Sequence, residues 1–152
     1  MFRATLRNVL TALSLVAGLS PTNSALAGSV PHKESSEGQI FNVTATQFEW
    51  ASAGYGTHFG NYTEAGVTRY YADGSVDGEF TVTAADGSTL TGIFYGTLGD
   101  LGGGYTGFSV TVEWLVGTGR LAGVTGIGSA SAVVENATGK AQIVASGDWS
   151  KD

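Results

Sequence analysis

The feature that most restricts the fold of this chain is an alternation of apolar and polar residues that is clearest over residues 106–116, TGFSVTVEWLV. The apolar positions on one face of this segment are Phe108, Val110, Val112, Trp114 and Val116. Because successive side chains of a strand point to opposite faces of a sheet, this period of two predicts a half-buried β-strand. Residues 75–84 and 140–150 alternate in the same way, and nothing after residue 38 keeps apolar residues at helical spacing. We therefore expect an all-β fold.

Short turns separate these segments. Residues 85–87 (ADG) and 136–139 (NATG) predict tight turns, because Asp, Asn and Gly tolerate a positive φ. Further strands are expected at residues 41–50, 56–63, 67–72, 88–98 and 126–135, which gives about eight strands in total. Short connections favour antiparallel neighbours, and glycines inside strands allow strong coiling. We expect a closed antiparallel barrel rather than a two-layer sandwich, because closure removes exposed edges.

The N-terminal 27 residues have the layout of a secretory signal peptide. Arg3 and Arg7 precede an apolar run over residues 9–19, and small residues surround a cut after Ala27. The alternative is an amphipathic first helix of the domain. The run is too short to cross a bilayer and no second long run follows, so we expect no membrane span. We expect a secreted or periplasmic protein, with residues 28–38 (GSVPHKESSEG) as a flexible leader and residues 39–152 as one barrel domain.

Composition excludes several partners and sites. The chain has 13 acidic and 7 basic residues, a formal net charge of −6, and loss of Arg3 and Arg7 would leave it more acidic. Such a surface repels phosphates, so we expect no nucleic-acid partner. The absence of cysteine excludes disulfides, thiolate metal ligands and a cysteine nucleophile. With only His58 in the expected barrel and scattered acids, no metal-ligand spacing is present, and we expect no metal site.

The glycine-rich segment GTGRLAGVTG, residues 117–126, is interpreted as a structural connection. It lacks both the Lys-Ser/Thr ending of a P-loop and the Gly-x-Gly-x-x-Gly dinucleotide spacing, and a strand-like segment follows it instead of a helix. We expect a structural loop that positions Arg120, with Arg120 bound to Glu49 or Glu113 as a clamp. The glycines of this loop are Gly117, Gly119, Gly123 and Gly126.

This loop resembles the Gly-Gly-Thr-Gly-x-Phe-x-x-Ala-x-Gly signature of dirigent proteins and allene oxide cyclases. Together with residues 57–60 (THFG) and 83–96 (TAADGSTLTGIFYG), it is similar to small exported bacterial proteins of that barrel superfamily. The resemblance spans residues 57–149. It implies an eight-stranded barrel with an apolar interior, in which allene oxide cyclases fold a fatty-acid epoxide and dirigent proteins orient radical phenols, neither with a cofactor. Catalytic residues do not carry over, because the matching blocks are turn and strand signatures, and Leu121 stands where Phe is usual.

Three residues are candidates for catalysis: His58, Glu49 and Tyr70. His58 could act as a general acid or base, because the pKa of histidine lies near neutrality, or it could simply hydrogen-bond across neighbouring strands. Three others are candidates for ligand binding: Arg69, Tyr95 and Trp114. Arg69 would hold a ligand carboxylate if it points inward, or lie on the rim if it points outward. Trp114 would line a pocket or pack in the core.

Three functions fit these observations. The first is an exported barrel that binds an apolar or aromatic small molecule in its interior. The second is a cofactor-independent cyclase or isomerase of the allene oxide cyclase type. The third is a structural or interaction protein of the cell envelope that uses an outer sheet face. A homo-oligomer formed through such a face is also left open.

Overall fold

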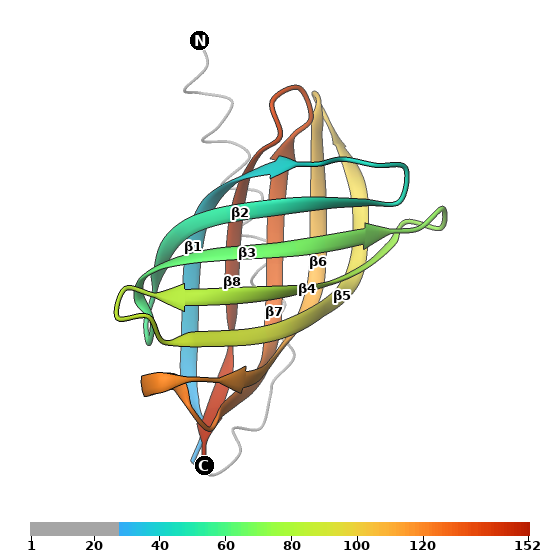
Figure 1. Ribbon diagram of the computed structural model, residues 1–152. Coiled ribbons are helices and arrows are strands. Elements are labelled where there is room, and N and C mark those ends of the chain that lie inside the picture. Colours follow the sequence, from blue (N-terminus) through green and yellow to red (C-terminus); the bar gives the residue numbers. More distant parts are fainter. Residues whose placement is uncertain (1–27) are drawn as a thin grey trace.

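The computed structural model describes residues 28–152, which form a closed barrel of eight antiparallel strands (Figure 1). The strands are β1 (Val30–Phe41), β2 (Gln47–Gly56), β3 (Gly60–Tyr70), β4 (Ser75–Ala84), β5 (Thr89–Gly102), β6 (Tyr105–Gly117), β7 (Val124–Glu135) and β8 (Lys140–Lys151). Each strand pairs with its neighbour in sequence, and β1 pairs with β8 to close the ring. The predicted fold class is confirmed. The predicted signal peptide, residues 1–27, lies outside the described residues.

The structure differs from two expectations about the N-terminal part of the barrel. The flexible leader predicted for residues 28–38 is wrong from Val30 onward, because these residues pair along β2 on one side and β8 on the other. Polar side chains on both faces of β1, with His32, Glu34 and Ser36 inward, hide the strand pattern. The segments predicted at residues 56–63 and 67–72 largely make one strand, β3, and the segment at residues 41–50 is divided between β1 and β2.

The predicted turns and inward faces agree with the structure except at one bulge. Gly87 and Gly139 adopt positive φ values of 83° and 72° in the β4–β5 and β7–β8 turns. Within β6, Trp114 pairs with Gly92 but Val116 pairs with Thr91, which leaves Leu115 as an extra residue. This β-bulge turns Val116 outward, so its predicted place on the inner face is wrong.

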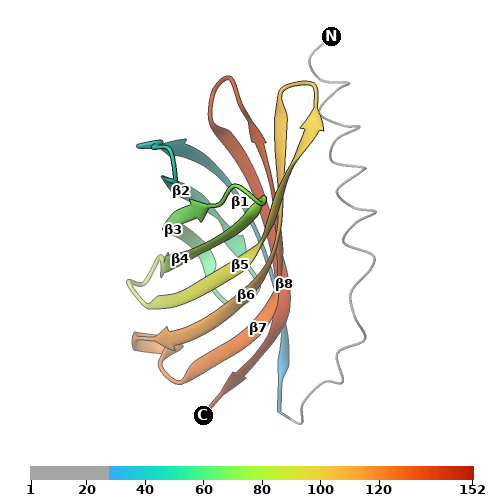
Figure 2. The ribbon, with the colours of Figure 1, turned by 90° about the vertical axis from the view of Figure 1, so that its right-hand side faces the viewer.

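The two ends of the barrel differ. At the end where β1 begins and β8 finishes, the interior is filled by an aromatic cluster of His32, Phe59, Trp114 and Trp149. At the other end lie the β1–β2, β3–β4, β5–β6 and β7–β8 connections; Figure 2 shows the last two projecting away from the C-terminus. We call these the packed end and the loop end.

The glycine-rich loop belongs to the packed end. It contains a 3₁₀ turn, η1 (Gly119–Leu121), that joins β6 to β7. A Cβ on Gly117 would lie 1.8 Å from the Leu121 carbonyl oxygen, so only glycine fits there. The Arg120 guanidinium donates to Asp86 Oδ2 at 2.8 Å and to the carbonyls of His58 and Phe59 at 2.5 and 3.1 Å. The expected clamp therefore exists, but its predicted acidic partner, Glu49 or Glu113, was wrong.

Candidate functional site

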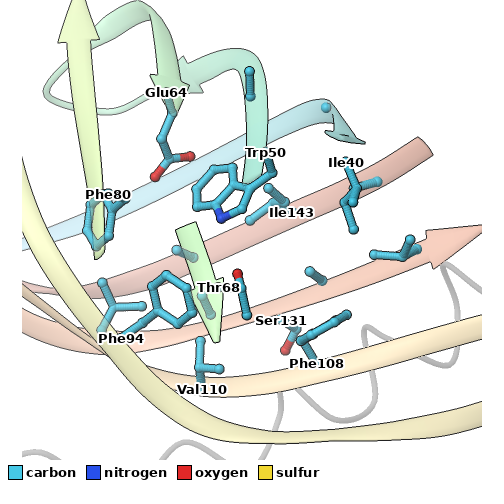
Figure 3. Close-up of a pocket in the computed structure, with 18 of the residues that line it drawn as sticks. Ile40, Trp50, Glu64, Thr68, Phe80, Phe94, Phe108, Val110, Ser131 and Ile143 are labelled. Carbon is cyan, nitrogen blue, oxygen red and sulfur yellow. The ribbon is translucent and has the colours of Figure 1, made fainter. Parts of the chain in front are cut away.

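An interior cavity of about 90 Å³ lies between the packed end and the loop end (Figure 3). Its walls are mainly apolar and aromatic. All eight strands contribute to them: β4 and β5 give one residue each, and the other strands give two or more. The larger side chains that line it are Ile40, Phe48, Trp50, Phe80, Phe94, Phe108, Val110, Val112, Val134 and Ile143. The cavity reaches toward the loop end, since Ile40 and Phe48 lie one residue from the ends of β1 and β2. Small residues on β7 and β8, among them Ala130, Ala141 and Ala145, leave this space open.

Two carboxyl groups enter this apolar space from β1 and β3. Glu34 and Glu64 both line the cavity, and Figure 3 shows the Glu64 carboxylate directed into it beside Trp50 and Phe80. Glu64 is 7% exposed and accepts a hydrogen bond from Ser52 Oγ at 3.2 Å. Ser36, two residues after Glu34 on the same inward face, is 6% exposed and lies beside Tyr62, but it is not among the residues that line the cavity.

Burial shifts the titration of both acids upward. Loss of solvation raises the pKa of Glu64 to about 8; the nearby Glu34 carboxylate adds to this shift and the Ser52 hydrogen bond opposes it. Burial also raises the pKa of Glu34 to about 7. The two acids therefore hold at least one proton near neutral pH, because two adjacent charges in an apolar space are costly.

His32 connects this pair to the packed end. Its Nε2 lies 3.0 Å from Glu34 Oε2, and its Nδ1 lies 3.4 Å from Thr57 Oγ1. Burial, aided by the nearby His58, lowers the pKa of His32 to about 3, so the ring is neutral at physiological pH. Burial and the two glutamates raise the pKa of Tyr62, which faces inward next to them on β3. The polar wall of the cavity, Glu34 and Glu64, thus has no cation beside it within residues 28–152.

The structure separates the three catalytic candidates from one another. His58 lies in the β2–β3 turn at the packed end, where its Nε2 is 2.9 Å from the Pro31 carbonyl oxygen. Glu49 is on the outer face of β2 and accepts a hydrogen bond from Asn42 Nδ2 at 2.6 Å. Tyr70 ends β3 at the loop end, where its hydroxyl donates to the Thr44 carbonyl. None of the three lines the cavity.

The three ligand-binding candidates also lie away from the cavity walls. Arg69 is on the outer face, 2.5 Å from Asp77 Oδ1, and its side chain is 41% exposed. Tyr95 is on the outer face of β5, with its hydroxyl 3.1 Å from Glu113 Oε1. Trp114 points inward and is completely buried, but it packs in the aromatic cluster below the cavity.

The residues that reasoning from sequence missed are Glu34 and, as a cavity residue, Glu64. A signal for Glu64 was present in GNYTEAGVTRY, residues 60–70. Tyr62, Glu64 and Thr68 are separated by even numbers of residues and so lie on the same face of the strand. An acid on the buried face of a strand is unusual and indicates a functional position. Glu34 had no such signal, since its strand lacked any apolar pattern.

Within residues 28–152, no three His, Asp or Glu side chains are grouped so that they could hold a metal ion. In the same part of the chain, no helix has the length and apolar character needed to cross a membrane. No protein-family model matches the sequence, and no curated protein matches it either. The resemblance to dirigent proteins and allene oxide cyclases therefore stays a prediction.

Proposed function

We propose that this protein binds a small molecule with an apolar body inside its barrel. The observation that carries the proposal is the cavity of about 90 Å³ enclosed by aromatic and aliphatic side chains. Protein interiors are normally packed with few voids larger than a water molecule, so an apolar space of this size is a natural ligand site. Its position within a closed barrel, below the connecting loops, gives a ligand one direction of entry.

The buried acids support the same proposal. Placing Glu34 and Glu64 in an apolar interior costs stability, and apolar side chains of similar size would pack there at lower cost. Carboxyl groups with raised pKa values inside a cavity are typical of sites that bind or transform a ligand. Small-molecule sites also usually combine many apolar side chains with a few polar groups, as this cavity does.

We further propose that binding takes place outside the cytoplasm. This part rests on the sequence of residues 1–27, with its basic start, apolar run and small residues before the expected cut. The absence of cysteine means that the barrel needs no oxidising compartment for disulfide formation, so it can fold on either side of a membrane.

Native purification followed by organic extraction and mass spectrometry tests the binding function. We expect one small molecule per chain, and we expect an added apolar probe such as 1-hexanol to change the fluorescence of Trp50, which lines the cavity. Trp50→Phe should remove the probe-dependent change, because Trp114 and Trp149 lie in the packed end. A protein that yields no extracted molecule and does not respond to the probe would contradict the proposal.

A second candidate is a cofactor-independent isomerase or cyclase. The observation that favours it is a carboxyl group, Glu64, that keeps its proton near neutral pH while facing an apolar cavity. Such an acid can protonate a bound epoxide or polyene. Turnover of an unsaturated fatty-acid epoxide that is lost in Glu64→Gln and retained in His58→Ala would support it; no turnover by the unaltered chain would exclude it for this substrate class.

A further inference from the structure

The charge inside the barrel is unbalanced. Glu34 and Glu64 face the cavity, yet neither forms an ion pair with Lys or Arg within residues 28–152. Arg69 and Arg120 are bound to Asp77 and Asp86 outside the barrel. The three described lysines, Lys33, Lys140 and Lys151, are exposed. His32 touches Glu34 but is neutral, so the described residues supply no positive charge to this site.

A cation is the ligand group that fits such a site. A ligand carboxylate would add a third acid to the pair and be repelled. A neutral apolar ligand would gain no hydrogen bond from either carboxyl group, and the acids would keep only their uncharged partners His32 and Ser52. An ammonium group gains charge-assisted hydrogen bonds from both, and the aromatic walls formed by Trp50, Phe80 and Phe94 also favour a cation.

The ligand's shape follows from the cavity's size. An engineered cavity of about 150 Å³ in another protein binds benzene, and the space here is smaller, about 90 Å³. A straight alkyl chain is narrower than a ring and can extend past Ile40 and Phe48 toward the loop end. Glu34 and Glu64 lie deeper, since Glu34 pairs with Gly56 at the packed end of β2 and Glu64 pairs with Ser52.

From these observations we infer that the barrel binds a primary amine with a linear apolar tail, its ammonium held between Glu34 and Glu64 and its tail directed to the loop end. This inference rests on the proposed binding function. A primary ammonium has three N–H donors. The two carboxylates have four oxygens between them, so they can accept all three.

Binding of an amine also moves protons. A free alkylamine has a pKa near that of lysine, about 10.4, so it arrives protonated. The ammonium requires ionised acids, so a protonated Glu34 or Glu64 releases its proton to solvent while the amine keeps its own. The titratable groups that face this pair are His32 on β1 and Tyr62 on β3, with the uncharged Ser52 on β2. Amine affinity should therefore increase as pH rises through about 7 to 8.

The test compares three probes with the same tail on the full chain: hexylamine, 1-hexanol and hexanoate. Isothermal titration in two buffers of different ionisation enthalpy gives both the affinity and the number of protons released. We expect hexylamine to bind most tightly, with proton release. Glu64→Gln should weaken hexylamine binding about tenfold or more and leave 1-hexanol within about twofold. Glu37→Gln, on the outward face of β1, is the matched control and should change neither.

The outcomes separate this inference from the function on which it rests. If 1-hexanol or hexanoate binds as tightly as hexylamine, or Glu64→Gln leaves hexylamine affinity unchanged, the amine inference is wrong while interior binding stands. If no probe binds, the inference and the proposed function both fail. If Glu64→Gln does not fold, Glu34→Gln takes its place and should weaken hexylamine binding in the same way. Proton release by the unaltered chain is a second test. Hexylamine binding without release of a proton between about pH 7 and 8 overturns the inference.

Discussion

The imidazole of His32 stacks on the indole of Trp149, with ring centroids 3.8 Å apart and an interplanar angle of 11°. His32 belongs to β1 and Trp149 to β8, so this contact joins the first and last strands where the barrel closes. The same histidine touches Glu34 at the cavity wall. One residue therefore links barrel closure to the polar part of the site.

Replacing this ring should weaken the closure. We expect His32→Ala to lower the free energy of unfolding by about 3 kcal/mol, because it removes a fully buried ring that packs on Trp149, Trp114 and Phe59. Urea unfolding followed by tryptophan fluorescence measures it. His58→Ala is the control and should cost less than about 1.5 kcal/mol, since His58 is only partly buried. Equal losses in both variants would contradict a special role for His32.

The stability of the barrel should fall with rising pH above neutrality. The raised pKa values of Glu34 and Glu64 mean that the folded chain keeps protons that the unfolded chain has already released. Their contribution is fully present below the ordinary carboxyl value of 4.5 and is lost as pH rises through about 7 and 8. His32 has the opposite effect, but only below its ordinary value of 6.5.

Between about pH 6.5 and 8.5 only the acids act, and we expect a loss of about 2–3 kcal/mol in the free energy of unfolding. Urea titrations at several pH values measure this loss. Glu64→Gln should flatten the dependence and be more stable than the unaltered chain at the upper end, because Gln stays neutral. A stability that stays constant over this interval would show that both acids are already ionised in the folded protein.

A larger side chain in the cavity should raise the stability of the barrel and weaken ligand binding. Ala130 lines the cavity on β7, and Ala130→Val adds two carbon atoms to that space. We expect the free energy of unfolding to rise by about 0.5–1 kcal/mol while 1-hexanol affinity falls about fivefold or more. Ala53→Val, on the exposed outer face of β2, should leave affinity unchanged. An Ala130→Val protein that still binds 1-hexanol normally would place the probe elsewhere.

The arginine clamp should matter more than an exposed ion pair of similar geometry. Arg120 joins the 3₁₀ turn to Asp86 and to the carbonyls of His58 and Phe59, whereas Arg69 pairs only with Asp77 among the acids. We expect Arg120→Ala to cost about 1 kcal/mol through the lost carbonyl bonds, and Arg69→Ala at most about half of that. Thermal unfolding of both variants checks the order, and the reverse order would contradict it.

Much of the fold could be predicted because most strands bury apolar side chains on one face only. Val76, Phe80 and Val82 on β4, and Val112 and Trp114 on β6, point inward as their alternation indicates. The β-bulge at Leu115 could not be predicted, since it depends on how β5 and β6 pair and not on the local pattern. Val116 was therefore assigned to the wrong face.

The site was harder to predict, for a physical reason. Its polar wall includes β1, whose inward side chains His32, Glu34 and Ser36 give the segment the composition of a loop. The polar inward face of this strand is therefore what hides it in the sequence. Arg69 and Tyr95 were candidates because of their residue types. Each directly follows a buried residue of its strand, Thr68 and Phe94, so each lies on the outer face.

A crystal structure of the full chain soaked separately in hexylamine and in 1-hexanol tests the central claim, that the interior is a ligand site, most directly. The account predicts density for both probes among Trp50, Phe94 and Phe108, with the amine nitrogen against Glu64. An interior filled by its own side chains, with both probes absent from it at saturating concentration, would contradict it.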